Sequence, residues 1–140
     1  MYFWDIIKSN DSKAKLSNLK NLVVLAAADG RIAKEELAAI AEVMSRDGLT
    51  NSDLERCIKH PESVKFVAPK SDEQRLRYLH DMVILMLCDG DINKNEVALC
   101  KITALALGYK HEVIDALVYK TIEDVKQEIL FDAIIDEANC

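Results

Sequence analysis

The sequence contains few of the residues that interrupt regular structure. Its 140 residues include only two prolines and four glycines, and aromatic residues make up 6% of the chain. Proline and glycine are the residues that most often end helices and strands, so their scarcity predicts long uninterrupted elements. Alanine, leucine, lysine and glutamate are plentiful, and these residues lose little side-chain freedom in a helix. The composition therefore predicts an all-α fold.

An excess of positive charge is also lacking, which argues against a nucleic-acid partner. Eighteen Lys and Arg residues stand against 24 Asp and Glu residues, giving a formal net charge of −6. The basic residues are scattered among carboxylates, whereas phosphate binding requires clustered Lys and Arg. An acidic surface can instead attract a cation or a basic surface of another protein. We therefore expect a protein partner and no nucleic acid.

No segment of the chain predicts secretion or a membrane span. No apolar run reaches the ~18 residues needed to cross a bilayer, and residues 1–8 lack the basic region of a signal peptide. The cysteines form no Cys-x-x-Cys pair, and two of them, Cys88 and Cys100, fall on apolar helical stretches. This pattern is typical of reduced thiols. Together these features predict a cytoplasmic protein.

The most informative feature of the sequence is an internal repeat. Residues 29–36 read DGRIAKEE, and residues 89–96, at an offset of 60 positions, read DGDINKNE. The correspondence extends beyond this motif, since Leu19 matches Leu79 and Gly48 matches Gly108 at the same offset. The repeat predicts one domain spanning residues 1–140. It consists of a unit at about 1–60, a second unit at about 61–120 and a C-terminal helix at about 121–138.

Helical periodicity in both units predicts a single bundle of about seven to eight helices. In each unit one helix ends at an Asp-Gly pair and a second ends at a later glycine, Gly48 or Gly108. Thr50 and Ser71 stand where they would cap the helices that follow. The helix after Gly90 is apolar on nearly every side, so we expect it to be the central and most buried helix.

Three further segments complete this prediction. Residues 1–10 are too apolar for a loose tail and predict a short docking helix. Residues 61–70 are bracketed by prolines and predict an extended linker, with Phe66 and Val67 packed against the bundle. Thr121 is a candidate cap for the last helix.

The repeated motif Asp-Gly-x-Ile-x-x-x-Glu resembles the second half of an EF-hand loop. The first half of such a loop is missing. Its first and third positions would be Leu25 and Ala27 in the first copy, and neither supplies a side-chain oxygen. Because calcium takes six to eight oxygen ligands, neither turn alone can form an EF-hand.

A site shared by the two turns is the functional interpretation that remains. If the units pack about a pseudo-two-fold axis, the turns would pool the carboxylates of four candidate metal ligands, Asp29, Glu36, Asp89 and Glu96. A divalent cation, calcium or magnesium, would relieve their mutual repulsion. In the structural alternative, the two glutamates stabilise the positive ends of the following helices and the two aspartates bond to backbone amides of the turns.

Each copy of the motif resembles the signature of the tellurite-resistance TerB-like family. The signature Ala-Asp-Gly-x-Ile-x-x-x-Glu stands at residues 28–36. It returns at residues 88–96, with Cys88 in place of the alanine and Asn95 in place of an acid. Residues 3–8 are also similar to the start of such proteins. The resemblance implies an all-helical bacterial domain associated with stress responses, whose acidic residues bind a divalent metal.

No recognisable catalytic motif is present, since the sequence has no nucleophile elbow, P-loop or dinucleotide fingerprint. Cys57 and His60 have no second pair at matching spacing, which argues against structural zinc. His80 beside Asp81 is interpreted as a surface histidine with an incidental acid. We therefore predict a non-enzymatic stress-response or scaffold domain that binds another protein. The alternatives are a small metal- or ligand-carrying protein and, third, an unrecognised hydrolase.

Overall fold

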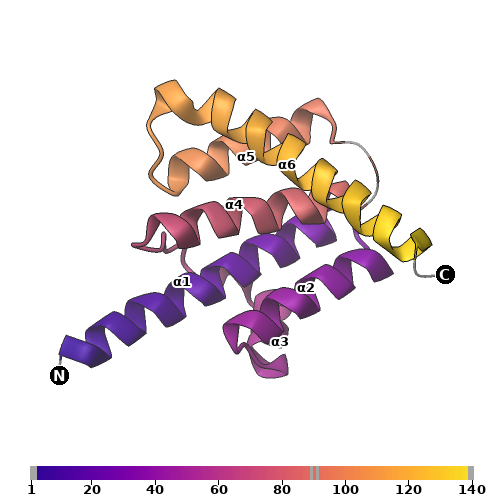
Figure 1. The fold of residues 1–140 in the computed structure, drawn as a ribbon. Coiled ribbons are helices and arrows are strands. Elements are labelled where there is room, and N and C mark those ends of the chain that lie inside the picture. Colours follow the sequence, from indigo (N-terminus) through magenta and orange to yellow (C-terminus); the bar gives the residue numbers. More distant parts are fainter. Residues whose placement is uncertain (1–2, 89, 91, 139–140) are drawn as a thin grey trace.

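The computed structural model describes residues 3–88, 90 and 92–138, with the side chains of 3–9, 29 and 138 left out. Within this part the α-helices are α1 (Phe3–Ala26), α2 (Lys34–Asp47), α3 (Asn51–Lys59), α4 (Asp72–Leu87), α5 (Lys94–Ala106) and α6 (His111–Ala138). Two 3-10 helices, Ala27–Asp29 and Pro61–Ser63, lie between them. The described residues contain no strand, which confirms the all-α class (Figure 1). None of these helices is both long and apolar enough to cross a bilayer.

Two predicted helix boundaries are wrong, and both errors divide one helix into two. The backbone of α1 is continuous from Phe3, so residues 3–10 belong to a long helix and form no separate docking helix. Likewise, α6 begins at His111 and contains Thr121 in its interior. The Thr121 hydroxyl donates to the carbonyl of Leu117 at 2.8 Å, a bond that threonine makes readily inside a helix. The described residues therefore form six α-helices, fewer than the seven to eight predicted.

Helix ends follow the local signals in the sequence. All four glycines have positive φ, between 69° and 113°: Gly30, Gly48, Gly90 and Gly108. A positive φ ends a helix and carries little cost for glycine. The Thr50 hydroxyl accepts a hydrogen bond from the backbone N–H of Asp53 at 3.2 Å. The Ser71 hydroxyl accepts one from the N–H of Gln74 at 3.0 Å. Both predicted caps are confirmed.

The central helix of the fold is α4. It packs against α1, α2, α5 and α6, and eight of its 16 residues are buried. In α5 the buried residues are Cys100 and Ala104, whereas Ile102 and Leu105 are 64% and 53% exposed. The prediction that the helix after Gly90 is the most buried one is therefore wrong. A helix that is apolar on every side is usually buried on every side. One side of α5, however, has no neighbouring helix among the described residues.

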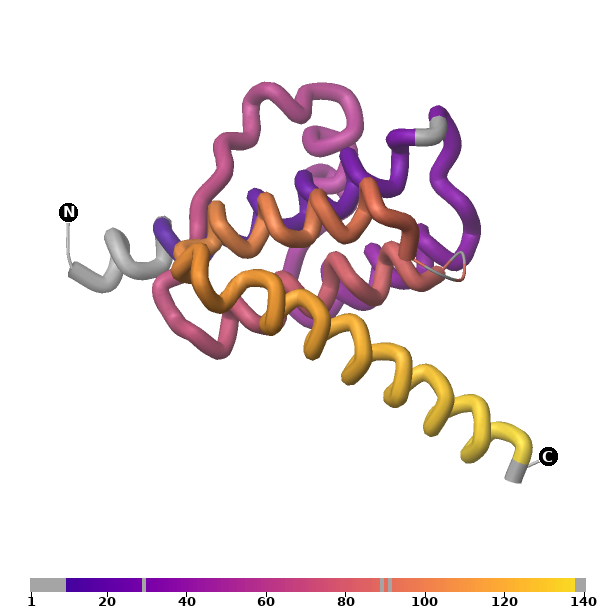
Figure 2. The backbone as a smooth tube through the Cα atoms, turned by 90° about the horizontal axis from the view of Figure 1, so that it is seen from above, coloured from indigo at the N-terminus to yellow at the C-terminus, as the bar shows by residue number. Residues whose placement is uncertain are grey.

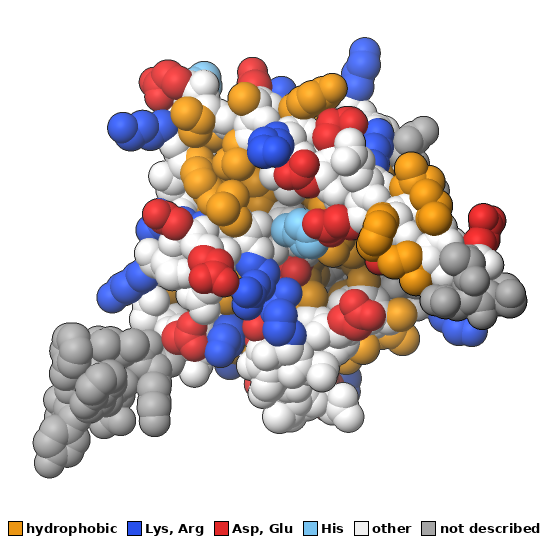
Figure 3. Space-filling model, viewed as in Figure 1, with side chains coloured by type: hydrophobic (Ala, Val, Ile, Leu, Met, Phe, Trp, Pro, Cys, Tyr) orange, Lys and Arg blue, Asp and Glu red, His pale blue; other side chains and the backbone are white. Residues whose placement is uncertain are grey.

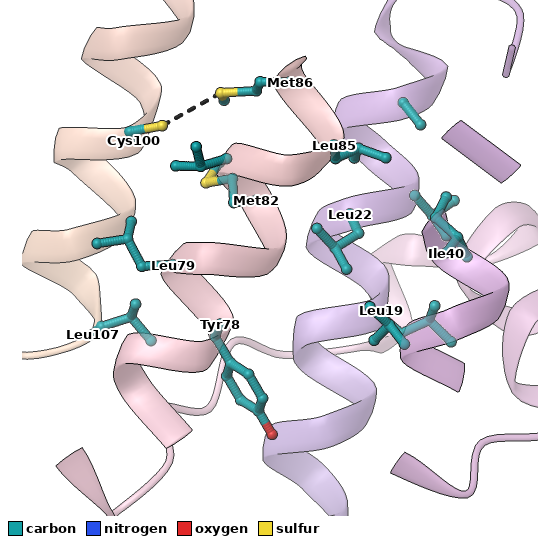
Figure 4. Close-up of a cluster of buried hydrophobic side chains, with 14 of the residues drawn as sticks. Leu19, Leu22, Ile40, Tyr78, Leu79, Met82, Leu85, Met86, Cys100 and Leu107 are labelled. Carbon is teal, nitrogen blue, oxygen red and sulfur yellow. Dashed lines mark hydrogen bonds between the residues drawn. The ribbon is translucent and has the colours of Figure 1, made fainter. Parts of the chain in front are cut away.

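The helices pack in two groups on either side of the α1–α4 pair. α2 and α3 lie against α1, while α5 and α6 lie against α4 (Figure 1). Figure 4 shows the core between them, where Leu19 and Leu22 of α1 meet Ile40 of α2 and Leu85 of α4. The second half of α6 extends past this core (Figure 2).

The connection between α3 and α4 packs against the middle of α1. Val64 is buried, and Val67 packs against the core as predicted. Phe66, predicted to pack beside it, is 41% exposed instead. The backbone N–H of Val67 donates to the hydroxyl of the buried Ser17 at 3.0 Å, which fixes the connection to α1.

Candidate functional site

The end of α4, directly before the second Asp-Gly pair, lies close to the start of α2, which follows the first pair. The Sγ atom of Cys88, directly before the second turn, lies 3.8 Å from the carbonyl oxygen of Glu35, which follows the first turn. The same sulfur lies 3.4 Å from the carbonyl oxygen of Ile84 in its own helix. Figures 1 and 2 agree that the end of α4 lies beside the start of α2. A shared site requires the two turns to lie close together, and this contact joins the helices beside them.

The two glutamates of the predicted metal site bind the starts of their own helices. Glu36 Oε1 accepts a hydrogen bond from the backbone N–H of Ala33 at 3.1 Å. Glu96 Oε1 accepts one from the N–H of Asn93 at 3.2 Å. Each bond satisfies a backbone donor at a helix N-terminus, which is the role given by the structural alternative. Each glutamate uses one of its two carboxylate oxygens in this way.

The two turns differ in how completely they are capped. The Oδ1 atom of Asn93 accepts the backbone N–H of Glu96 at 2.9 Å, so the second turn has a reciprocal capping box. Ala33, at the same place in the first turn, has no side-chain acceptor. The side chains of Asp29 and Asp89 lie outside the described residues. Among the side chains that are described, no group of three or more His, Cys, Asp or Glu could hold a metal ion.

A partly buried ion pair joins α2 to α4. Nη1 and Nη2 of Arg46 each lie 2.8 Å from a carboxylate oxygen of Asp81. The amide of Asn18 in α1 donates to the same carboxylate at 3.1 Å. Arg46 also donates to Asp47 at 3.1 Å. The hydrogen bonds that Arg46 donates to Asp81, followed by those that it donates to Asp47, raise the pKa of its guanidinium above the usual value.

This network serves to position helices. The Asp81 side chain is 4% exposed, and a buried carboxylate of this kind needs a partner. The sequence contains a signal for it, since Asp81 stands among Leu79, Met82 and Val83 on a strongly apolar helix. The identity of the partner depends on the packing of α2 on α4. His80, interpreted above as having an incidental acid, contacts Glu128 of α6 at 3.0 Å instead.

A cavity of about 250 Å³ lies between α2 and α4 beside this network. Ile40, Val43 and Ile84 give it apolar walls, and Glu42 and His80 lie at its edge. Figure 3 shows acidic and basic side chains mixed over this face of the molecule. The Arg46 guanidinium is occupied by two carboxylates, so the cavity offers little to an anion. No serine, threonine or cysteine lines it.

An apolar groove of about 320 Å³ separates α1 from α5. Val24 lines it from α1, Leu99 and Ile102 line it from α5, and Phe66 lines it from the connection. These four side chains are 48%, 37%, 64% and 41% exposed, respectively. Asn21 and Thr103 add polar groups to the lining. This is the uncovered side of α5.

Two cysteines and a tyrosine are buried without a chemical role in these sites. The Sγ atom of Cys100 lies 3.3 Å from Met86 Sδ (Figure 4), and burial raises the pKa of this thiol to about 11. Burial also raises the pKa of Cys57. The Tyr78 hydroxyl has no hydrogen-bond partner among the described residues. Tyr78 borders a cavity of about 10 Å³ lined also by Ser17 and Asn18, which is room for one water molecule.

Comparison with known proteins gives no relative. No family model matches the chain, and no curated protein or solved structure matches it either. The TerB-like resemblance stays a prediction from the motif at residues 28–36 and 88–96.

Proposed function

We propose that this chain is a non-enzymatic, protein-binding scaffold domain of the TerB-like type, built from two tandem helical units and acting in a stress response. The observation that supports it best is the apolar groove between α1 and α5. Soluble domains rarely leave neighbouring large apolar side chains half exposed unless another molecule covers them. A groove between two helices is a common receptor for a third helix.

The lining of the groove suits an amphipathic helix from a partner. Leu99 and Ile102 are three residues apart on α5 and face Val24 across the groove, so they can receive apolar side chains at helical spacing. Asn21 and Thr103 can bond to polar groups at its edge. The partner's apolar face would thereby cover the side of α5 that the domain itself leaves open.

An Ile102→Glu substitution tests this proposal. A charge in the groove should reduce recovery of the bound partner at least about tenfold, because it must be desolvated on binding. The measurement is quantitative pull-down from cells that naturally express the protein. Ile58→Glu on α3 is the matched control, since Ile58 is 52% exposed and lies outside the groove. Equal recovery of every protein with both variants would contradict the proposal.

Binding of a divalent cation, calcium or magnesium, is the second candidate function, and it belongs to the metal-carrying alternative. The contact between Cys88 and Glu35 favours it, because it joins the end of the helix before the second turn to the start of the helix after the first. The proposed ligands are Asp29, Glu36, Asp89 and Glu96. Glu36 and Glu96 each keep one carboxylate oxygen that their own helix starts do not use.

Melting temperature measured against added calcium, magnesium or manganese tests the cation site. A cation at about one hundred times its dissociation constant should raise the melting temperature by roughly 5–10 °C. Asp29→Asn with Asp89→Asn should abolish the rise, and Glu55→Gln on the exposed side of α3 should preserve it. No rise with any of the three ions would remove this candidate. A chelator added to the pull-down separates the two functions, since the groove needs no metal.

A further inference from the structure

The second half of α6 has an apolar face that points away from the domain. The residues of α6 that pack into the core are at most 8% exposed: Ile114, Val118, Ile122 and Val125. Beyond Ile129 the large apolar residues change sides. At about 100° per residue, the next set centres roughly opposite the core-facing set: Leu130, Phe131, Ile134 and Ile135. Their exposed fractions are 62%, 62%, 55% and 41%. We call these four side chains the tip face.

No described element covers the tip face. Figure 2 shows the end of α6 extending beyond the other helices. Figure 3 shows apolar side chains gathered on the same part of α6, next to the C-terminus. The tip face is separate from the α1–α5 groove, because no residue of α6 lines that groove.

Carboxylates border the tip face on both sides. Residues 123–137 contain six acidic residues and a single basic one, Lys126. Asp124 and Glu128 precede the tip face along one side of the helix. Both already have a partner within the domain, since Asp124 lies 3.4 Å from Lys120 and Glu128 lies 3.0 Å from His80. Glu137 follows Leu130 by seven residues and borders the other side. Glu137 forms no ion pair with any residue that the structure describes. The same is true of Asp132 and Asp136, which lie on the opposite side of the helix from the tip face.

Two occupants fit this surface poorly. In a second copy of the chain the same carboxylates would face each other and repel. The exposed parts of the tip face amount to roughly two large side chains, on the order of 400 Å². A stable protein pair buries about 800 Å² on each partner. The headgroups of anionic lipids would likewise be repelled by the acidic border.

We propose that the tip face docks a basic amphipathic helix of another protein. The apolar stripe of that helix packs on Phe131 and Ile134, and its flanking Lys or Arg side chains face the carboxylates that border the tip face. Because the apolar area is small, charge attraction supplies much of the affinity. Binding is therefore weak, about micromolar, and sensitive to salt. This surface is additional to the α1–α5 groove, so the chain presents two docking surfaces.

Two synthetic peptides test the proposal, each about 18 residues long so that it can form a helix. They share the same Leu positions at helical spacing and differ in having Lys or Glu beside them. We expect the Lys peptide to bind the whole protein at least tenfold more tightly than the Glu peptide by fluorescence anisotropy, and salt to weaken it. Phe131→Ser with Ile134→Ser should reduce the affinity at least tenfold. These residues are exposed, so circular dichroism should show an unchanged fold.

Each other outcome would overturn the inference. Equal binding of both peptides would exclude charge recognition. Lys-peptide binding that survives Phe131→Ser with Ile134→Ser would exclude the tip face. A dimer that these substitutions dissociate, detected by light scattering, would identify a second copy as the occupant. Binding to phosphatidylserine vesicles, lost in the same variant, would identify a membrane. Ile102→Glu in the groove should leave peptide binding unchanged. The pull-down with Ile102→Glu therefore tests the groove independently of the tip face.

Discussion

At the scale of single residues, the ion pair between Arg46 and Asp81 should be a large contributor to stability. The Asp81 side chain is 4% exposed, so removing Arg46 leaves a buried carboxylate with a single amide donor, from Asn18. We expect Arg46→Met to lower the free energy of unfolding by about 3 kcal/mol, measured by urea denaturation. Adding Asp81→Asn to this variant should recover most of the loss, because the uncompensated charge is then absent. If Arg46→Met alone were as stable as the original protein, the ion pair would not have this role.

The buried thiols predict a loss of stability in alkaline solution. Burial raises the pKa of Cys100 to about 11, whereas an unfolded cysteine loses its proton at about 8.5. The contribution of this group is therefore fully present below about pH 8.5 and is lost as the pH rises towards about 11. The free energy of unfolding, measured by urea denaturation across this range, should fall. Replacing Cys57 and Cys100 by Ala should make the fall shallower; an equally steep fall would assign it to other groups.

At the scale of the helices, α4 and α5 should respond very differently to truncation of a side chain. Leu79 on α4 is 0% exposed, and Leu79→Ala should cost about 3 kcal/mol through lost contacts and a cavity. Ile102 on α5 is 64% exposed, so Ile102→Ala should change stability by less than about 0.5 kcal/mol. Urea denaturation of both variants checks this order. The reverse order would mean that α5 is the buried helix after all.

The sequence was most informative where the signal is local. Thr50 and Ser71 cap their helices as predicted, because a cap depends on residues three positions apart. The sequence was least informative about contacts between residues that are far apart along the chain. The sequence of α5 does not indicate that one side of this helix has no neighbour. The sequence around Asp81 does not indicate that its ion-pair partner is Arg46, 35 residues earlier. For the candidate metal site, the capping role of Glu36 and Glu96 was predictable from the sequence, whereas a site shared by the two turns stays a prediction.

At the scale of the whole molecule, the end of α6 should be dispensable for folding. Its side chains from Ile129 to Glu137 are all exposed, so deleting residues 130–140 should move the melting temperature by no more than about 2 °C. The same deletion should abolish binding of the Lys peptide. A longer deletion from residue 122 also removes Ile122 and Val125, which are buried, and should lower the melting temperature sharply. A large loss from the shorter deletion would mean that the tip belongs to the core.

The continuity of α6 has a mechanical consequence. A straight helix of 28 residues is about 42 Å long. In α6 the helix is continuous between the half that packs against α4 and α5 and the half that projects. The helix is therefore a lever whose fulcrum lies near Val125. A load applied to the outer arm would tilt the inner arm between its two neighbours, so a force at the periphery reaches the centre of the protein without a flexible joint.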